Sequence, residues 1–474
     1  MAQAQCVMND PVKQFLAGEQ VPEGFVLEVD GEQYHCERVL RWLPGQRLVV
    51  RALHQGAPLL LKLFAPNKKG WRELSREQHG YKACKAAGIR VPAEKLISDD
   101  FAGCLAVAYE FIADASPFKL VGANQAQMVP ALLQLMVSCH QAGIYQHDIH
   151  TDNMLMTPRG LVLIDLASVR GQPGVSLNTK KSLNNIARLL AQFVPEQQQL
   201  ILTKLNLYYQ ARGWVYGQAE REQFKSLLNK AWQKRKDNYL SKCFRPCTMT
   251  AYDKDNHLEY AVKRAFFDQI GDHAIRNINT FVEQGEKLKQ GNSATVVVTE
   301  MAERQVVIKR YNIKSHWHFL KRFWRPSRAA NAWRQGNLLA LLGIPTPTVL
   351  GFVEKRFGPF RKQAYLITEY RQGAREISEV YRATSPSTAE LNQLHRIFSL
   401  MRDYQLSHGD LKASNLLMSE VGEIELIDLD AMTQHRCAWL FRRAFARDQK
   451  RFLRNWQGKA LYSRFKLMIE NLAQ

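Results

Sequence analysis

The sequence has 474 residues, of which 46% are apolar, so it is longer than one ordinary domain and predicts two. We find no segment dominated by low-complexity sequence, which argues for a globular protein and against a disordered one. No apolar run reaches the length of about 18 residues that a membrane span needs. The N-terminus lacks the basic and then apolar pattern of a signal peptide, and we therefore expect a cytoplasmic protein.

The net charge is strongly positive, because 65 Lys and Arg outnumber 44 Asp and Glu and give +21. Such an excess favours an anionic partner, which could be nucleic acid, a membrane surface or a phosphorylated substrate. A basic surface that serves solubility remains open. The eight cysteines form no CxxC pair, which favours free thiols over a zinc site.

The first predicted elements are a glycine-bearing turn at Gly45 and an apolar strand over residues 59–63 that carries Lys62. A helical stretch follows, and it offers Glu73 or Glu77 as the acidic partner of Lys62. The next apolar strand ends in a glutamate. The candidate cofactor contacts of this segment are Gly45, Lys62, Glu77 and Glu110.

A polar loop and a predicted hairpin come next in the chain. The loop carries Asp148 and, five residues later, Asn153, and Asp165 follows 17 residues after Asp148. Two apolar strands flank the turn between Asn153 and Asp165. A helical segment over residues 180–245 then completes a first domain, predicted over 20–250, and polar residues 252–257 resemble a linker.

The same order of features returns in a second domain, predicted over residues 258–474. A strand over 306–310 carries Lys309, and Asp428 follows Asp410 by 18 residues. The corresponding candidates are Gly291, Lys309, Glu369 and Lys412 for the cofactor, Asp410 for catalysis, and Asn415 and Asp428 for metal. Five features in one shared order are very improbable by chance.

These residue types suit phosphoryl transfer, which consists chiefly of positioning and charge neutralisation. A strand lysine can hold the α- and β-phosphates of ATP, which assigns Lys62 and Lys309. An aspartate accepts or orients the proton of the acceptor hydroxyl, which assigns Asp148 and Asp410. An asparagine and a later carboxylate can share Mg²⁺. The predicted metal ligands are Asn153 with Asp165 and Asn415 with Asp428.

The two copies differ around these positions. The second has His408 two residues before Asp410 and Lys412 two after it, whereas the first has Gln146 and His150 at those places. Conversely, the predicted helix 328–336 of the second copy contains no acidic residue. Another group must therefore steady Lys309, or its phosphate contact is weaker.

The second copy resembles the lipopolysaccharide core sugar kinase family (Kdo/WaaP type), an atypical branch of the protein-kinase fold. The similar motifs are residues 289–291, 307–312, 325–329, 343–347, 408–411 and 427–430. The first copy is similar to a more distant relative over about residues 43–245.

The resemblance implies an α+β protein made of two tandem bilobal kinase-like domains, each with a small β-rich N-lobe and a helical C-lobe. It implies an ATP-dependent sugar kinase of the bacterial cytoplasm that phosphorylates heptose or a related inner-core sugar at the inner leaflet. The implied partner is the lipopolysaccharide core or a lipid A-core intermediate. A scaffold with one non-catalytic, nucleotide-binding domain and a protein Ser/Thr kinase remain as alternatives.

Two aromatic and cationic stretches bear on membrane contact. Taken as helices, residues 314–325 and 441–456 place aromatic side chains opposite Lys and Arg, which suits an anionic membrane interface. For 441–456 we favour ordinary packing of the aromatics on their own domain. We recognise no nucleic-acid-binding motif, so nucleic acid is not an expected partner.

Overall fold

The computed structural model describes residues 10–121, 125–291, 294–311, 327–358, 360–458 and 460–473. It is a mixed α+β protein that divides into two compact units, Met1–Gln233 and Lys234–Gln474. The boundary falls within helix α7 (Gln218–Lys242), so each unit contains part of this helix. The predicted stretch 314–325 lies outside the described residues.

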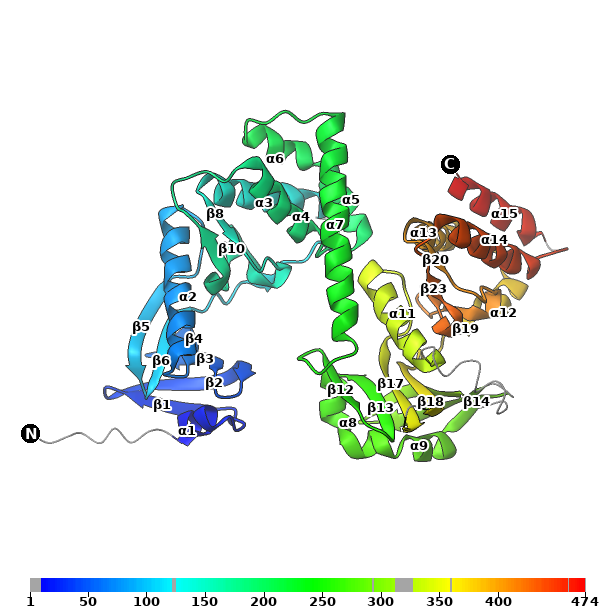
Figure 1. Cartoon of the computed structure of the whole chain (residues 1–474), viewed down its shortest axis with the longest axis horizontal. Helices are drawn as coiled ribbons and strands as arrows, with labels where there is room; N and C mark the ends of the chain where they lie inside the picture. The colour runs from blue at the N-terminus through cyan, green and yellow to red at the C-terminus, as the bar shows by residue number, and fades with distance from the viewer. Residues whose placement is uncertain are drawn as a thin grey trace, which may run out of the picture. The chain divides into compact units, whose positions relative to one another are not determined.

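A six-stranded antiparallel sheet, in the order β1-β2-β3-β4-β6-β5, begins the first unit. Helix α2 (Lys68–Ala86) runs beside it in Figure 1. A side-chain oxygen of Asn67 caps the N-terminus of α2 by accepting from two backbone amides at 3.0 Å. The strands are β1 (Phe25–Val29), β2 (Glu32–Leu43), β3 (Arg47–His54), β4 (Ala57–Phe64), β5 (Glu94–Phe101) and β6 (Cys104–Glu110), and helix α1 (Asp10–Ala17) precedes them.

The rest of the first unit is helical, with short strand pairs that carry the loops. Its apolar core joins these helices to α2 and β6. The helices are α3 (Gln125–Gln141), α4 (Thr179–Leu190), α5 (Pro195–Thr203), α6 (Leu205–Ala211) and the start of α7. The short elements are β7 (Ser116–Pro117), β8 (Ile144–Gln146), η1 (Thr151–Asn153), β9 (Met154–Thr157), β10 (Gly160–Leu163), η2 (Leu166–Ser168) and β11 (Val169–Gly171).

The second unit has a seven-stranded antiparallel sheet in the order β12-β13-β17-β18-β16-β15-β14. Helix α11 (Arg328–Leu342) packs on β17 and β18, as Figure 1 shows. The strands are β12 (Thr250–Lys254), β13 (Leu258–Lys263), β14 (Glu286–Gln290), β15 (Ala294–Met301), β16 (Arg304–Tyr311), β17 (Val349–Phe357) and β18 (Phe360–Glu369). Helices α8 (Arg264–Arg276) and α9 (Ile278–Gln284) connect β13 to β14.

Helices and short strand pairs follow this sheet too. The helices are α12 (Ile377–Ala383), α13 (Thr388–Asp403), α14 (Ala438–Arg454) and α15 (Leu461–Glu470). The short elements are β19 (Arg375–Glu376), β20 (Leu406–Ser407), η3 (Ala413–Asn415), β21 (Leu416–Met418), β22 (Ile424–Leu426), η4 (Leu429–Ala431), β23 (Thr433–Gln434) and η5 (Asn471–Ala473).

The two sheets share a five-strand arrangement. In the first unit the order β2-β3-β4-β6-β5 places the lysine strand β4 between a hairpin with the glycine turn and the pair β6-β5. In the second unit β14-β15-β16-β18-β17 repeats this order, with β16 as the lysine strand. The pairs β8-β11 and β9-β10 of the first unit likewise have counterparts in β20-β23 and β21-β22. The features that recur in the same order in the sequence thus lie on strands that recur in the same order in the two units.

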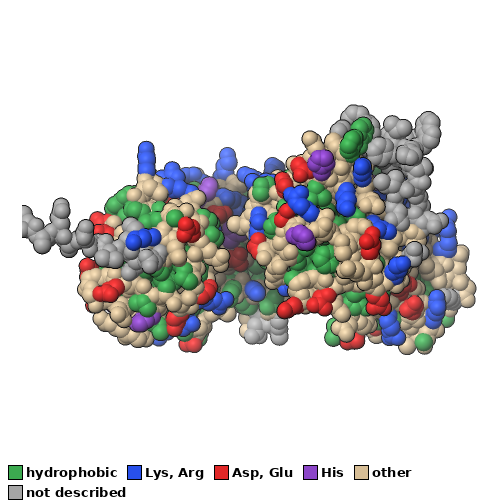
Figure 2. Space-filling model, turned by 90° about the horizontal axis from the view of Figure 1, so that it is seen from below, with side chains coloured by type: hydrophobic (Ala, Val, Ile, Leu, Met, Phe, Trp, Pro, Cys, Tyr) green, Lys and Arg blue, Asp and Glu red, His purple; other side chains and the backbone are tan. Residues whose placement is uncertain are grey.

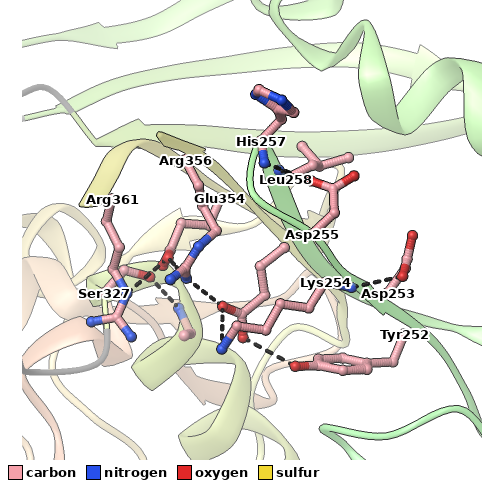
Figure 3. Close-up of polar contacts among 12 residues, drawn as sticks. Tyr252, Asp253, Lys254, Asp255, His257, Leu258, Ser327, Glu354, Arg356 and Arg361 are labelled. Atoms are coloured by element: carbon pink, nitrogen blue, oxygen red, sulfur yellow. Dashed lines mark hydrogen bonds and ion pairs between the residues drawn. The ribbon is translucent and has the colours of Figure 1, made fainter. Parts of the chain in front are cut away.

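Residues 252–257, which resemble a linker in the sequence, lie instead in the β12–β13 hairpin. Their polar character comes from an Asx turn, in which Asp255 accepts from the amides of His257 and Leu258 at 2.6 and 2.7 Å. Figure 3 shows this turn beside the strand residues of β17. Polar residues therefore mark a turn within the second unit, since β12 pairs with β13.

A buried ion-pair network joins strands of the second sheet (Figure 3). Glu354 is 1% exposed and accepts from Arg356 at 2.9 Å and Arg361 at 2.8 Å. Arg356 also pairs with Glu259 of β13 at 2.6 Å, which connects β13 to β17. Burial raises the pKa of Glu354, as expected for a carboxylate removed from water.

The aromatic face of residues 441–456 packs within its own unit. Phe441, Phe445, Phe452 and Trp456 are all buried, with Phe452 and Trp456 in ring contact with Phe465 of α15. Ordinary packing is therefore confirmed for this stretch. On the face drawn in Figure 2, Lys and Arg are scattered among acidic and apolar side chains. No helix among the described residues combines the length and apolarity that crossing a bilayer requires.

Candidate active site

The order of elements that the two units share places Lys309 of β16 against the turn that follows β22. Its ammonium donates to Asp428 and lies 3.5 Å from Asp430. Asp428 has φ of 62°, a left-handed conformation that is uncommon outside glycine and often marks functional sites. Two carboxylates from this turn thus replace the acidic partner that helix α11 does not supply.

The charges of this cluster shift the pKa values of its carboxyl groups. Burial raises the pKa of Asp428, but the ammonium of Lys309 outweighs burial, so the pKa lies below its ordinary value. Burial and the charge of Asp428 leave the pKa of Asp430 above its ordinary value. The charged form is therefore favoured more strongly at Asp428 than at Asp430, which suits Asp428 as a cation ligand.

The loop after β20 places Asp410 among three donors. Lys412 lies 3.5 Å from Oδ2, Asn415 donates to the same oxygen at 3.4 Å, and Arg451 of α14 donates to Oδ1. Asn415 also donates to the backbone oxygen of Asp410 at 2.8 Å, which closes the loop. The structure therefore brings together Asp410, Lys412 and Asn415 in one loop.

Helix α14 and a buried histidine hold this loop from behind. Asp448, 2% exposed, accepts from the backbone amides of His408 at 2.6 Å and Gly409 at 3.1 Å. The ring of His408 bonds the backbone oxygen of Ile427 at 2.9 Å, which ties the loop to the strand before Asp428. Burial lowers the pKa of His408, so its ring is neutral near pH 7. These contacts fix Asp410 relative to Asp428.

The other two cofactor candidates of the second unit lie at the ends of sheet strands. Gly291 follows β14 and donates its amide to Ala294 at 3.1 Å. Glu369 ends β18 and pairs with Arg371 at 3.4 Å, and Arg371 in turn binds Glu425 at 2.8 Å. The carboxylate of Glu369 thus has a local ion pair with Arg371 and also interacts electrostatically with Lys263.

In the first unit, Lys62 of β4 pairs with a helix glutamate. Lys62 Nζ lies 2.6 Å from Glu77 Oε1, which confirms Glu77 over Glu73 as its partner. Glu77 is fully buried, and its other oxygen accepts from the amide of Ala167 in η2 at 3.1 Å. Gly80 permits this approach, because a Cβ there would lie 2.0 Å from the oxygen of Leu166. Helix α2 therefore carries an acid directly to η2 and to Lys62.

The loop of the first unit repeats the backbone of the second with different charges. Asn153 donates to the backbone oxygen of Asp148 at 3.0 Å, as Asn415 does to Asp410. Asp165 is left-handed with φ of 57°. The carboxylate of Asp148 is 76% exposed and its ion pair is with His150 at 3.2 Å, where the second unit has Lys412 and Arg451. Asp148 is thus more exposed than Asp410 and contacts a histidine ring in place of a lysine and an arginine.

Gln146 takes the structural place of His408. Its side-chain amide donates to the backbone oxygen of Ile164 at 2.9 Å, as His408 bonds Ile427. The substitution therefore preserves the loop-to-strand connection. Gly45 and Glu110 lie at the β2–β3 turn and at the end of β6, the same places as Gly291 and Glu369.

Sequence reasoning missed Asp430, Asp448 and Arg451 as site residues. Asp430 was part of a motif without a role. Asp448 and Arg451 lie 20 and 23 residues after Asp428, and Asn185 and Arg188 of α4 lie at the same distances after Asp165. Asn185 and Arg188 contact the backbone oxygens of Gln146 and His147. The equal spacing in the two copies is a sequence signal for these positions, but it does not show what their side chains contact.

The oxygen ligands near Asp410 fit a hard cation such as Mg²⁺. Asn415 uses its amide nitrogen on Asp410, which leaves its amide oxygen as the donor for a cation. Asp428 supplies a charged carboxylate. Among the described residues, no group of three or more His, Cys, Asp or Glu side chains is arranged to hold a metal ion by itself.

The comparisons with known proteins concern the second unit. Residues 279–465 match the model of the Lipopolysaccharide kinase (Kdo/WaaP) family. Over 154 residues the chain is 27% identical to the "3-deoxy-D-manno-octulosonic acid kinase" of Xylella fastidiosa (strain M12), which covers 31% of this chain and 61% of that protein. The protein of the same name from strain 9a5c is 26% identical over 149 residues, or 30% and 59%.

The chain thus spans about three-fifths of the length of these curated relatives. The matched range includes Lys309, Asp410, Asp428 and helix α14, and it excludes the first unit. The segment 279–465, which contains Lys309, Asp410 and Asp428, is thus similar to the lipopolysaccharide kinase (Kdo/WaaP) family.

Proposed function

We propose that the second unit transfers the γ-phosphoryl group of ATP to a sugar hydroxyl of the lipopolysaccharide inner core. The observation that carries this proposal is the convergence of Lys309, Asp428, Asn415 and Asp410 within one family-matched segment. Heptose is the acceptor that the family resemblance implies, and the names of the relatives add 3-deoxy-D-manno-octulosonic acid.

Each residue has a role that its contacts support. Lys309 binds the α- and β-phosphates, moving from Asp428 to the nucleotide when ATP enters. Asp410 accepts the proton of the acceptor hydroxyl, whose oxygen bonds to the γ-phosphorus while the bond to the β–γ bridging oxygen breaks and ADP leaves. Lys412 lies beside Asp410 and neutralises charge on the transferred group. Asp448 and His408 keep the loop in place.

Asn415 and Asp428 would hold Mg²⁺, which would neutralise charge on the phosphates. Lys309 would then separate from Asp428 when nucleotide and cation bind, because the phosphates bind Lys309 and the cation binds Asp428. Gly291 follows β14 and Glu369 ends β18, and we propose that both residues contact the nucleotide.

The first unit fits a second bilobal, kinase-like domain that binds nucleotide with Lys62, Glu77, Asn153 and Asp165. Its exposed Asp148 and the His150 beside it favour a domain with low or no turnover, which keeps the scaffold alternative. The protein would act at the cytoplasmic face of the inner membrane, where its basic charge would favour an anionic glycolipid.

The test is phosphate transfer from ATP to inner-core oligosaccharide by the full chain, followed by mass spectrometry. We expect Asp410→Asn to lower kcat by at least about 100-fold, since the positioned base is removed while nucleotide contacts remain. Asp403→Asn, at an exposed residue that ends α13 and pairs with Arg402, should keep wild-type kcat. Near-wild-type turnover in Asp410→Asn would end the assignment of catalysis to the second unit.

A further inference from the structure

Arg451 occupies the one oxygen of Asp410 that the loop itself leaves free. Lys412 and Asn415 both approach Oδ2, whereas Arg451 of α14 donates to Oδ1. If Asp410 is to accept a hydroxyl proton, the acceptor must reach Oδ1 and Arg451 must leave it. The guanidinium is then available to another anion at the same place.

The position of Arg451 is set by the helix that holds the loop. Asp448 lies three residues earlier, on the same face of α14, and its buried carboxylate binds the amides of His408 and Gly409. The backbone of α14 is thus anchored to the loop, while the side chain of Arg451 is 48% exposed. A half-exposed ion pair is weak, so a better partner can displace Asp410.

The first unit shows that this contact is not a general requirement of the loop. Arg188 of α4 has the equivalent position, and it donates to the backbone oxygen of His147 rather than to Asp148. The loop of the first unit therefore keeps its shape without an arginine on its aspartate. The direct contact with the carboxylate belongs to the unit to which we assign catalysis.

We propose that Arg451 binds an anionic substituent of the acceptor sugar, a carboxylate or a phosphate monoester close to the hydroxyl that is phosphorylated. The planar guanidinium suits both groups, because it can form two parallel hydrogen bonds to either. Exchange of Asp410 for this substituent frees Oδ1 as the acceptor enters. Lys309 and Lys412 remain with the nucleotide phosphates, so Arg451 acts on acceptor recognition. This inference rests on the proposed function.

Steady-state kinetics of the full chain with paired acceptors test the role of Arg451. One pair is an inner-core fragment with its sugar-acid carboxylate free or as a methyl ester, and the other is the same fragment before and after phosphatase treatment. We expect Arg451→Gln to raise KM for the fragment that carries the recognised anion by about tenfold, with KM for ATP within about twofold. For the neutralised fragment of the same pair, Arg451→Gln should have nearly the same KM as the wild type, because the recognised anion is already absent.

The matched control is Arg454→Gln, an exposed arginine one turn further along α14, which should retain the wild-type KM for both members. Arg451→Lys should show an intermediate KM, because it keeps the charge and loses the paired bonds. An equal rise in KM for the charged and the neutralised fragment, or a rise in KM for ATP alone, would overturn the inference. The proposed function would still stand in that case if the wild type transfers phosphate. If the wild type transfers phosphate to none of the fragments, both the proposed function and the role of Arg451 are refuted.

Discussion

Two lysines on equivalent strands have different acidic partners. Lys62 pairs with Glu77 from the helix that follows its strand, whereas Lys309 pairs with Asp428 and Asp430, about 120 residues away in sequence. The first pair is almost completely buried, while Lys309 and Asp428 retain some exposure. The more buried pair should therefore contribute more to stability, and the more accessible pair should open more readily to a nucleotide.

Lys62→Ala should therefore reduce stability. The substitution leaves the buried carboxyl group of Glu77 without its main partner, and we expect the free energy of unfolding of the first unit to fall by about 3 kcal/mol. Urea unfolding followed by far-UV circular dichroism measures the change. Lys69→Ala, on the exposed start of α2, is the matched control, and a Lys62→Ala midpoint equal to that control would contradict the prediction.

At the scale of elements, helices α4 and α14 set the active-site loops from outside them. Each presents a polar residue to the loop backbone 20 residues after the left-handed aspartate, namely Asn185 and Asp448. Asn185 donates to a carbonyl, while Asp448 accepts from two amides, so the two loops are anchored through opposite backbone groups. The repeat preserves the place of the anchor and changes its chemistry.

The network around Glu354 anchors β17 in the second sheet, next to β18 and to the lysine strand beyond it. We expect Glu354→Gln to lower the free energy of unfolding by about 2 kcal/mol, because Arg356 and Arg361 lose a charged acceptor in a buried place. Urea unfolding followed by the fluorescence of buried Trp333 is the measurement. Glu300→Gln, on the exposed face of β15, serves as control, and equal midpoints for the two variants would refute the prediction.

At the scale of the whole molecule, the two units share one order of elements but differ in the residues around the loop aspartate. The second has Lys412 and Arg451 at its aspartate, and the first has His150. Both retain an asparagine five residues after that aspartate and a left-handed aspartate after the hairpin. This combination favours one catalytic unit and one that binds nucleotide with little turnover.

Asp148→Asn and Asp410→Asn, made separately in the full chain, test that division. We expect Asp148→Asn to keep turnover within about threefold of wild type, because the proposed chemistry occurs in the second unit. Transfer of labelled phosphate to core oligosaccharide is the measurement, with nucleotide binding followed in parallel. A loss in folded Asp148→Asn as large as in Asp410→Asn would indicate two cooperating active sites.

The sequence by itself determined the internal repeat, the α+β character and the identity of most candidate residues. These followed from local patterns, since a strand lysine, an Asp-to-Asn spacing and a hairpin each involve a few neighbouring residues. For the acidic partner of Lys62, the sequence left two candidates on one helix, Glu73 and Glu77. Residues 252–257 were misinterpreted, because a polar turn within a hairpin has the composition of a linker.

Only the tertiary structure decided which charges meet. Lys309 reaches Asp428 and Asp430, and Arg451 reaches Asp410, because strand pairing and helix packing bring together segments 119 and 41 residues apart in the chain. The same folding buries Asp448 behind the loop, where its carboxylate has backbone amides as partners. Such contacts depend on the relative placement of whole elements, which no local pattern of residues encodes.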